Sequence, residues 1–163
     1  MPVSLTFPAR INETSARLVA TGVIVLATGF LLSGQGWILA LLAYGFAARV
    51  LAGPTLSPLA QLVTRLLTPW VERAFDVRSN HVAGTPKRFA QGVGLACSSV
   101  AAVAWLLDAP AVTYVVLAML LVAASLEAVF GICLGCIAYG AIWGCADCDD
   151  ISGRLRAAVA QSR

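Results

Sequence analysis

The run of 32 residues from Thr113 to Gly144 reads TYVVLAMLLVAASLEAVFGICLGCIAYGAIWG, and it decides the fold class of this chain. Glu127 is its single charged residue. As one continuous helix the run would be about 48 Å long, whereas the hydrocarbon core of a bilayer is about 30 Å thick. We therefore predict a membrane span over about 113–137 that tilts, bends or emerges from the membrane. Three glycines are the expected places for a bend: Gly131, Gly135 and Gly140.

The composition of the whole chain supports the same class. Of 163 residues, 60% are hydrophobic and only 12% are charged, and the mean hydropathy is +0.86. A soluble domain of this size needs more charge on its surface, while lipid tolerates an apolar exterior and requires helices or a closed barrel. The net charge of +3 comes from arginines beside apolar segments, which concerns topology and anionic lipid rather than nucleic acid. We expect a protein of the lipid bilayer with no nucleic-acid partner.

Other apolar runs complete a bundle of four helices. Ser33-Gly34-Gln35-Gly36 and Asp108-Ala109-Pro110 are turn signals, so each joins two neighbouring spans. We predict an all-α membrane protein, one domain over 1–163, with four transmembrane helices arranged as two hairpins and a polar tail over 147–163. The predicted spans are about 16–33, 37–52, 89–107 and 113–137.

The polar centre of the chain contains an amphipathic segment over about 57–75. Ser57 can cap it with Pro58 at its first position, and Pro69 is expected to kink it or end it early. Its apolar residues recur at helical spacing: Leu59, Leu62, Val63, Leu66, Leu67, Trp70 and Val71. Its polar residues lie opposite: Gln61, Thr64, Arg65 and Glu72. The pattern predicts an interfacial helix between the two hairpins.

The basic residues predict the orientation. They lie in the amino-terminal segment, the central loop and the tail, and the two short turns have none. Since lysine and arginine collect on the cytoplasmic side, we expect both termini to be cytoplasmic. The reducing cytoplasm would then keep thiols at that side of the membrane reduced.

Cys133-Leu-Gly-Cys136 is the main candidate for chemistry. A CxxC pair can close a disulfide ring, hold a soft metal, or simply pack as small apolar side chains among Gly and Ala. Cys145-Ala-Asp-Cys148 is a second pair, and the four cysteines together could bind zinc, although an apolar eight-residue gap is short for such a site. Alternatively, Cys145 and Cys148 could relay electrons or sulfur to the first pair. Cys97 is expected to be a packing residue.

Glu127 needs an explanation because a carboxylate inside a span is costly. A proton-handling role and a structural ion pair are both open, and its candidate partners are Arg49, Lys87 and Arg88. On an unbroken helix Cys136 points to the face opposite Glu127, so a shared site would require a bend near Gly131. Lys87 or Arg88 would favour a Cys133 or Cys136 thiolate if either basic side chain lies close to it.

Several motifs occur in an order that resembles the DUF4395 family of bacterial membrane proteins. They are Gly53-Pro54, Ser57-Pro58-Leu59-Ala60, Pro86-Lys87-Arg88-Phe89-Ala90-Gln91 with Gly94, and Glu127 with Phe130-Gly131 before Cys133-Leu-Gly-Cys136 and Tyr139. The resemblance implies a four-helix fold in the bacterial inner membrane with a recurrent CxxC. It also implies thioredoxin-like or rhodanese-like partners. The Cys145 and Cys148 pair is not part of that pattern.

These features predict thiol–disulfide exchange or persulfide transfer by Cys133 and Cys136, with no bound cofactor. One thiolate would attack a disulfide or a sulfane sulfur, and the second would resolve the product. Two alternatives stay open. The protein could anchor soluble sulfur or redox enzymes, or it could be a small transporter of sulfur species or metal ions with Glu127 and Arg49 in its path. Four helices enclose a narrow path, so transport would favour a homo-oligomer.

Overall fold

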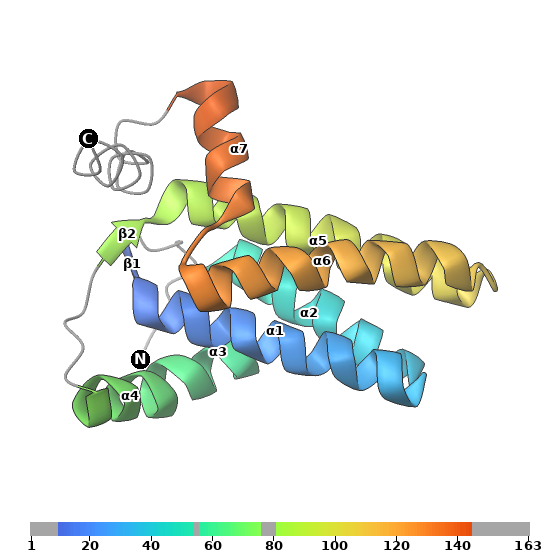
Figure 1. Cartoon of the computed structure of the whole chain (residues 1–163), viewed down its shortest axis with the longest axis horizontal. Helices are drawn as coiled ribbons and strands as arrows, with labels where there is room; N and C mark the ends of the chain where they lie inside the picture. Colours follow the sequence, from blue (N-terminus) through green and yellow to red (C-terminus); the bar gives the residue numbers. More distant parts are fainter. Residues whose placement is uncertain (1–9, 54–55, 76–80, 145–163) are drawn as a thin grey trace, which may run out of the picture.

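Four helices run side by side along the long axis of the molecule (Figure 1). The computed structural model describes residues 10–53, 56–75 and 81–144. The four helices are α1 (Glu13–Ser33), α2 (Gly36–Ala52), α5 (Gly84–Leu106) and α6 (Pro110–Phe130). Helix α2 packs on α5, α1 packs on α6, and α5 packs on α6, so the first two helices face the last two.

The core lies between these four helices. Phe30, Leu39 and Leu117 are almost fully buried there, and the Phe30 ring meets the Trp105 ring edge-on with 5.2 Å between centroids. Helices α2 and α5 approach closely at Gly94, where an added Cβ would lie 2.3 Å from the Phe46 ring. Glycine is therefore required at position 94 for this contact.

The outer surface of the bundle is apolar. Large side chains such as Val25, Leu106 and Met119 are at least 65% exposed, which is the exterior expected of a protein surrounded by lipid. Helices α1, α5 and α6 are long and apolar enough to cross a membrane. The predictions of spans near 16–33 and 89–107 are confirmed as apolar helices of sufficient length, and α5 begins five residues earlier, at Gly84.

The predicted span over 113–137 is wrong at its end. Helix α6 stops at Phe130 because Gly131 adopts a left-handed backbone (φ 71°), and the Gly131 N–H bonds the Glu127 carbonyl at 3.0 Å. Arg17 also donates to the Val129 carbonyl at 2.8 Å, which satisfies a backbone acceptor at the helix end. The bend expected at Gly131 is thus present.

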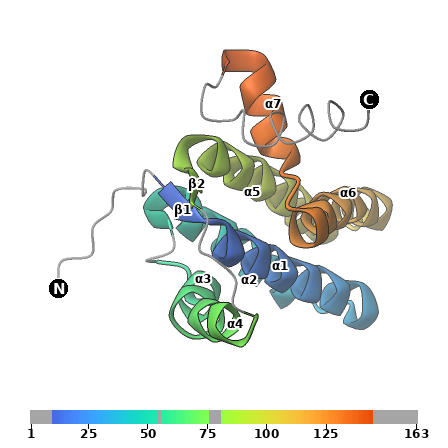
Figure 2. The ribbon, with the colours of Figure 1, turned by 60° about the vertical axis from the view of Figure 1, so that its left-hand side comes forward.

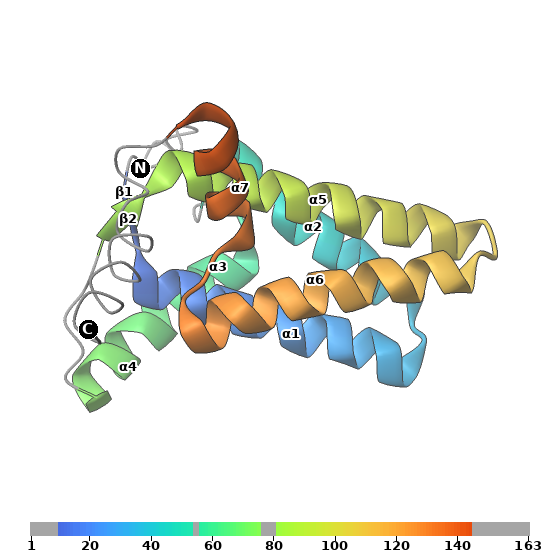
Figure 3. The ribbon, with the colours of Figure 1, turned by 45° about the horizontal axis from the view of Figure 1, so that its top comes forward.

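Helix α7 (Leu134–Trp143) begins after this break and turns away from the bundle axis (Figures 1 and 3). Its 10 residues give a length of about 15 Å, too short to cross a bilayer. Gly135 and Gly140, the other two expected bends, lie inside α7.

The central amphipathic helix is present as three consecutive parts: α3 (Pro58–Leu62), a π-helical turn η2 (Val63–Leu67) and α4 (Thr68–Phe75). The Ser57 side chain accepts from the Ala60 N–H at 3.4 Å, as expected of a cap. Pro69 neither ends nor begins the helix. Proline has no N–H to donate to the preceding turn. The π turn just before it, in which the Thr68 N–H bonds the Val63 carbonyl, lets the helix continue without that hydrogen bond.

This helix packs on α1. Ala60 and Val63 pack on Val19 of α1, and the Ser15 and Thr68 hydroxyls are 2.9 Å apart. Leu62, Leu66, Leu67 and Trp70 are exposed. These four side chains point away from the bundle, while Val63 of the same apolar set is buried. The polar residues Thr64, Thr68 and Glu72 line a cavity against the bundle. Figure 2 shows the helix on the side of the bundle opposite α7.

The all-α prediction is confirmed for the bundle, and a short antiparallel ribbon is added to it. Strand β1 (Arg10–Asn12) pairs with β2 (His81–Ala83). The Asn12 side chain then caps α1 by accepting from the Thr14 N–H at 2.9 Å. Three-residue strands carry too weak an alternation to be recognised in the sequence. The ribbon links the segment before α1 to the segment before α5.

Candidate functional site

The break after Gly131 places the CxxC pair at the first turn of α7. Cys133 is the N-cap residue with an extended backbone, and Cys136 lies three residues later in the helix. Both side chains are buried, with 3% and 9% exposure, and both thiols are free. The amino end of a helix carries a partial positive charge that favours a thiolate. The pair therefore occupies a position suited to thiol chemistry.

The two thiols differ in acidity. A hydrogen bond with the Cys136 side chain lowers the pKa of Cys133, against the opposing effect of burial. The same interaction raises the pKa of Cys136. Each thiol thus biases the other, and Cys133 is the one that ionises first.

Lys87 and Glu127 form an ion pair beside this dithiol. The Lys87 amine interacts electrostatically with both Cys133 and Cys136. The sequence placed Cys136 on the face opposite Glu127 unless the helix bends near Gly131, and the bend is what brings the carboxylate, the amine and the thiols together. The cation favours a Cys133 thiolate, whereas the carboxylate disfavours it.

The other candidate partners of Glu127 have different roles. Arg49 interacts with Glu127 electrostatically, but its Nε donates to the Gly45 carbonyl at 2.8 Å. Its guanidinium also lies 4.4 Å from the centre of the Phe46 ring. Arg88 donates from Nε to the Val50 carbonyl at 3.0 Å, where it satisfies an acceptor near the end of α2. Lys87 is therefore the direct partner of Glu127.

Helix α7 is held against α5 by a close backbone approach. A Cβ built on Gly135 would lie 2.5 Å from the Ala90 Cβ and 2.6 Å from the Ala90 Cα. Farther along, the Phe89, Tyr139 and Trp143 rings form a cluster with centroids 5.2–5.7 Å apart. Gly135 is thus a contact residue rather than a bend, and it positions the dithiol beside Lys87.

We expect Gly135→Ala to destabilise the protein by about 1–3 kcal/mol, since the added methyl group meets backbone that cannot move aside. It should also slow thiol modification at Cys133 by displacing α7 from Lys87. Thermal unfolding in detergent and the rate of thiol labelling measure the two effects. Gly92→Ala on α5 is the matched control, because nothing lies within 4 Å of its added Cβ. Equal behaviour of both variants would contradict the close-packing role.

The remaining candidates are placed as follows. Cys97 packs against the core, as its packing role predicts. Among the residues that the structure describes, no three His, Cys, Asp or Glu side chains gather in a group able to hold a metal ion. Cys145, Cys148 and the tail over 147–163 lie outside the described residues, so the zinc and relay hypotheses stay predictions.

Two contributors were not recognised in the sequence. Arg17 caps the end of α6 through its hydrogen bond to the Val129 carbonyl. Gln91 lies one turn beyond Lys87 on α5, and both line the cavity that Thr64 and Glu72 also line. The i, i+4 spacing of Lys87 and Gln91 was the available signal, because it puts two polar side chains on one face of an otherwise apolar helix.

A helical bundle with an apolar exterior and a buried dithiol defines this chain as a membrane protein with a candidate thiol site. The family described as "Domain of unknown function (DUF4395)" matches residues 11–143. The chain belongs to the DUF4395 family, as the sequence motifs predicted. No curated protein and no solved structure matches it.

Proposed function

We propose that the protein carries out thiol–disulfide exchange at the membrane, with Cys133 as the attacking thiolate and Cys136 as the resolving thiol. The observation that carries the proposal is the position of the CxxC at the first turn of α7, with Lys87 beside it. A helix amino terminus and a nearby cation both stabilise a thiolate. Packing alone requires neither feature.

The reaction follows from this geometry. The Cys133 thiolate attacks one sulfur of a substrate disulfide, forms a mixed disulfide and releases the other sulfur as a thiolate. The Cys136 thiol then loses its proton and displaces the second substrate sulfur, which leaves a Cys133–Cys136 disulfide. Two electrons pass from the dithiol to the substrate. A persulfide would be attacked by the same thiolate, so persulfide transfer shares the first step, and thioredoxin-like or rhodanese-like proteins are partners of suitable chemistry.

The proposal includes an orientation in the bacterial inner membrane. Helices α1, α2, α5 and α6 form two hairpins, and α2 with 17 residues completes four spans if flanking side chains reach the headgroups. Arg17, Arg49, Lys87 and Arg88 all belong to the end of the bundle that holds the dithiol, opposite the two short turns. The positive-inside rule supports a cytoplasmic position for that end and for both termini.

The test uses the full chain with Cys97, Cys145 and Cys148 replaced by serine. The protein is equilibrated with mixtures of reduced and oxidised glutathione. We expect Cys133 and Cys136 to become unreactive toward maleimide together, in a single two-electron transition. In cells, a membrane-impermeant maleimide should label the reduced pair only after permeabilisation. Thiols that oxidise independently, or that stay unreactive in the folded protein, would contradict exchange and favour the alternative of a membrane anchor in which the cysteines pack.

A further inference from the structure

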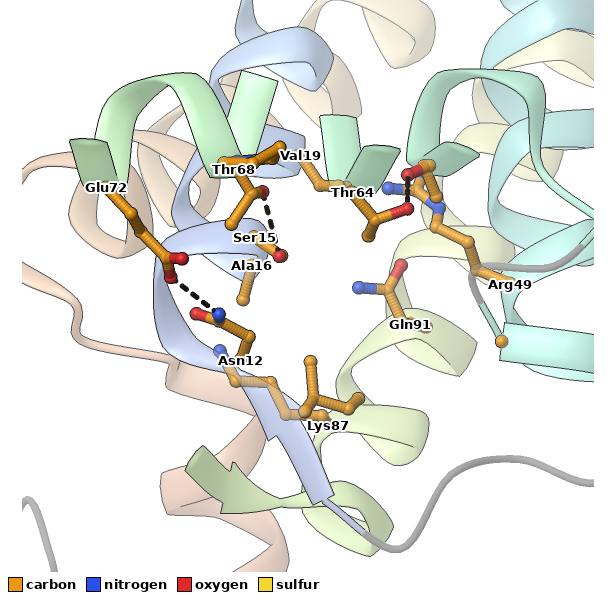
Figure 4. A pocket seen from close by; sticks show the side chains of 14 residues that line it. Asn12, Ser15, Ala16, Val19, Arg49, Thr64, Thr68, Glu72, Lys87 and Gln91 are labelled. Carbon is orange, nitrogen blue, oxygen red and sulfur yellow. Dashed lines mark hydrogen bonds between the residues drawn. The ribbon is translucent and has the colours of Figure 1, made fainter. Parts of the chain in front are cut away.

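A cavity of about 440 Å³ lies between α1, α2, α5 and the helix over 58–75. Figure 4 shows polar side chains from each of these elements around it, including Asn12, Thr64, Arg49, Lys87 and Gln91. A cavity of this size is within the range of small-molecule sites. Polar side chains are costly in the interior of a membrane protein unless they meet partners. Asn12, Thr64 and Lys87 each meet a partner within the protein, so the atoms of interest are those without one.

Two atoms of the lining lack a partner. Arg49 is only 5% exposed, and although its Nε is bonded to Gly45, its buried Nη1 has no hydrogen-bond partner among the described residues. The buried Oε1 of Gln91, which lines the same cavity, is likewise without one. A buried donor left unpaired is destabilising, and more so when the group is charged. The Nη1 of Arg49 is therefore a buried donor that is available to a ligand.

The charges around the cavity favour an anion at the Arg49 end. Arg49 and Lys87 both interact with the carboxylate of Glu127, but the direct ion pair of Glu127 is with Lys87. Glu72 also lines the cavity, but on the side away from Arg49 in Figure 4, where it accepts a 2.8 Å hydrogen bond from Asn12. Among the residues that the structure describes, the Arg49 guanidinium forms no salt bridge, so the Arg49 end of the cavity favours an anion.

We infer that this cavity binds a small oxyanion through Arg49. The anionic oxygen accepts from Nη1, and a donor on the same ligand bonds Oε1 of Gln91, as a protonated phosphate does. The site is separate from the thiol reaction, although Lys87 borders both. Free inorganic phosphate and a phospholipid headgroup both present anionic phosphate oxygens to Nη1 of Arg49. A phosphodiester has no P–O–H, so in a phospholipid the donor to Gln91 is an amine or hydroxyl of the headgroup.

The experiment measures binding of inorganic phosphate to the detergent-solubilised full chain, by calorimetry and by the shift of the thermal unfolding midpoint at constant ionic strength. We expect saturable binding that is at least about tenfold weaker in Arg49→Gln, because a charge-assisted hydrogen bond is lost. Arg73→Gln is the matched control: it removes the same charge from an exposed position outside the cavity lining.

Gln91→Met provides a second variant should Arg49→Gln fail to fold, since it keeps the side-chain length and removes an atom that has no partner. It should also weaken phosphate binding. Native mass spectrometry distinguishes the two sources: a phospholipid retained by the wild type and lost in either variant assigns the headgroup, and phosphate binding without retained lipid assigns the free anion. Absence of both, or binding unchanged in both variants, would overturn the inference while leaving the thiol proposal intact.

Discussion

Cys133→Ser is expected to reduce the rate of disulfide exchange at least about 100-fold, because a serine hydroxyl does not ionise near neutral pH and cannot replace the attacking thiolate. Cys133 occupies the N-cap of α7. Its pKa lies below the ordinary thiol value because of a hydrogen bond between the Cys133 and Cys136 side chains. The thiolate thus forms at lower pH than in an ordinary cysteine. The rate of reduction of a small aromatic disulfide by the detergent-solubilised protein measures the effect.

Cys136→Ser should behave differently and so assigns the two roles. It retains the attacking thiolate but not the resolving thiol, so a mixed disulfide on Cys133 should accumulate and be visible by mass spectrometry. Cys97→Ser is the control, since Cys97 packs against the core cluster of the bundle and is not part of the CxxC pair. Accumulation of the mixed disulfide in Cys133→Ser instead would reverse the assignment.

Lys87→Gln is expected to lower the free energy of unfolding by about 3–5 kcal/mol, because it leaves the carboxylate of Glu127 buried and unpaired. The Lys87 and Glu127 side chains are only 9% and 16% exposed, so water cannot easily replace the lost partner. Thermal or denaturant unfolding in detergent measures the loss. The variant should also slow labelling of Cys133, since a cation that favours its thiolate is removed.

A double variant separates the ion pair from the thiol chemistry. Lys87→Met with Glu127→Leu removes both charges and should recover most of the stability, since a buried pair replaced by apolar residues is often neutral. Arg73→Gln, at an exposed position, controls for the loss of one positive charge. A loss in Lys87→Gln no larger than in Arg73→Gln would show that the pair contributes little to stability.

The sequence identified where the helices lie along the chain, but it did not identify which face of a helix packs on the bundle. Spans near 16–33 and 89–107 were visible as apolar runs, and the left-handed glycine at Gly131 was among the expected bends. The helix over 58–75 was recognised too, but its periodicity did not show that its polar residues Thr64 and Glu72 line a cavity against the bundle. In a membrane protein the core and the lipid are both apolar, so helical periodicity cannot tell an inward face from an outward one.

Contacts distant in sequence were equally hidden. Pairing of β1 with β2 joins segments about 70 residues apart, and three-residue strands give no readable alternation. Gly135 looked like a hinge because nothing local distinguishes a bend from a close approach. Its role depends on Ala90 of another helix.

By itself the sequence determined the membrane class. With 60% hydrophobic and only 12% charged residues, the chain has too few charges to cover its surface in water, so that surface must face lipid. It also determined the family and the CxxC as the place where chemistry is expected. Only the tertiary structure decided what surrounds that pair. The break after Gly131 turns α7 against α5 and brings Lys87 and Glu127, 40 residues apart, to the same thiols, since helix packing and not sequence spacing sets which buried charges meet.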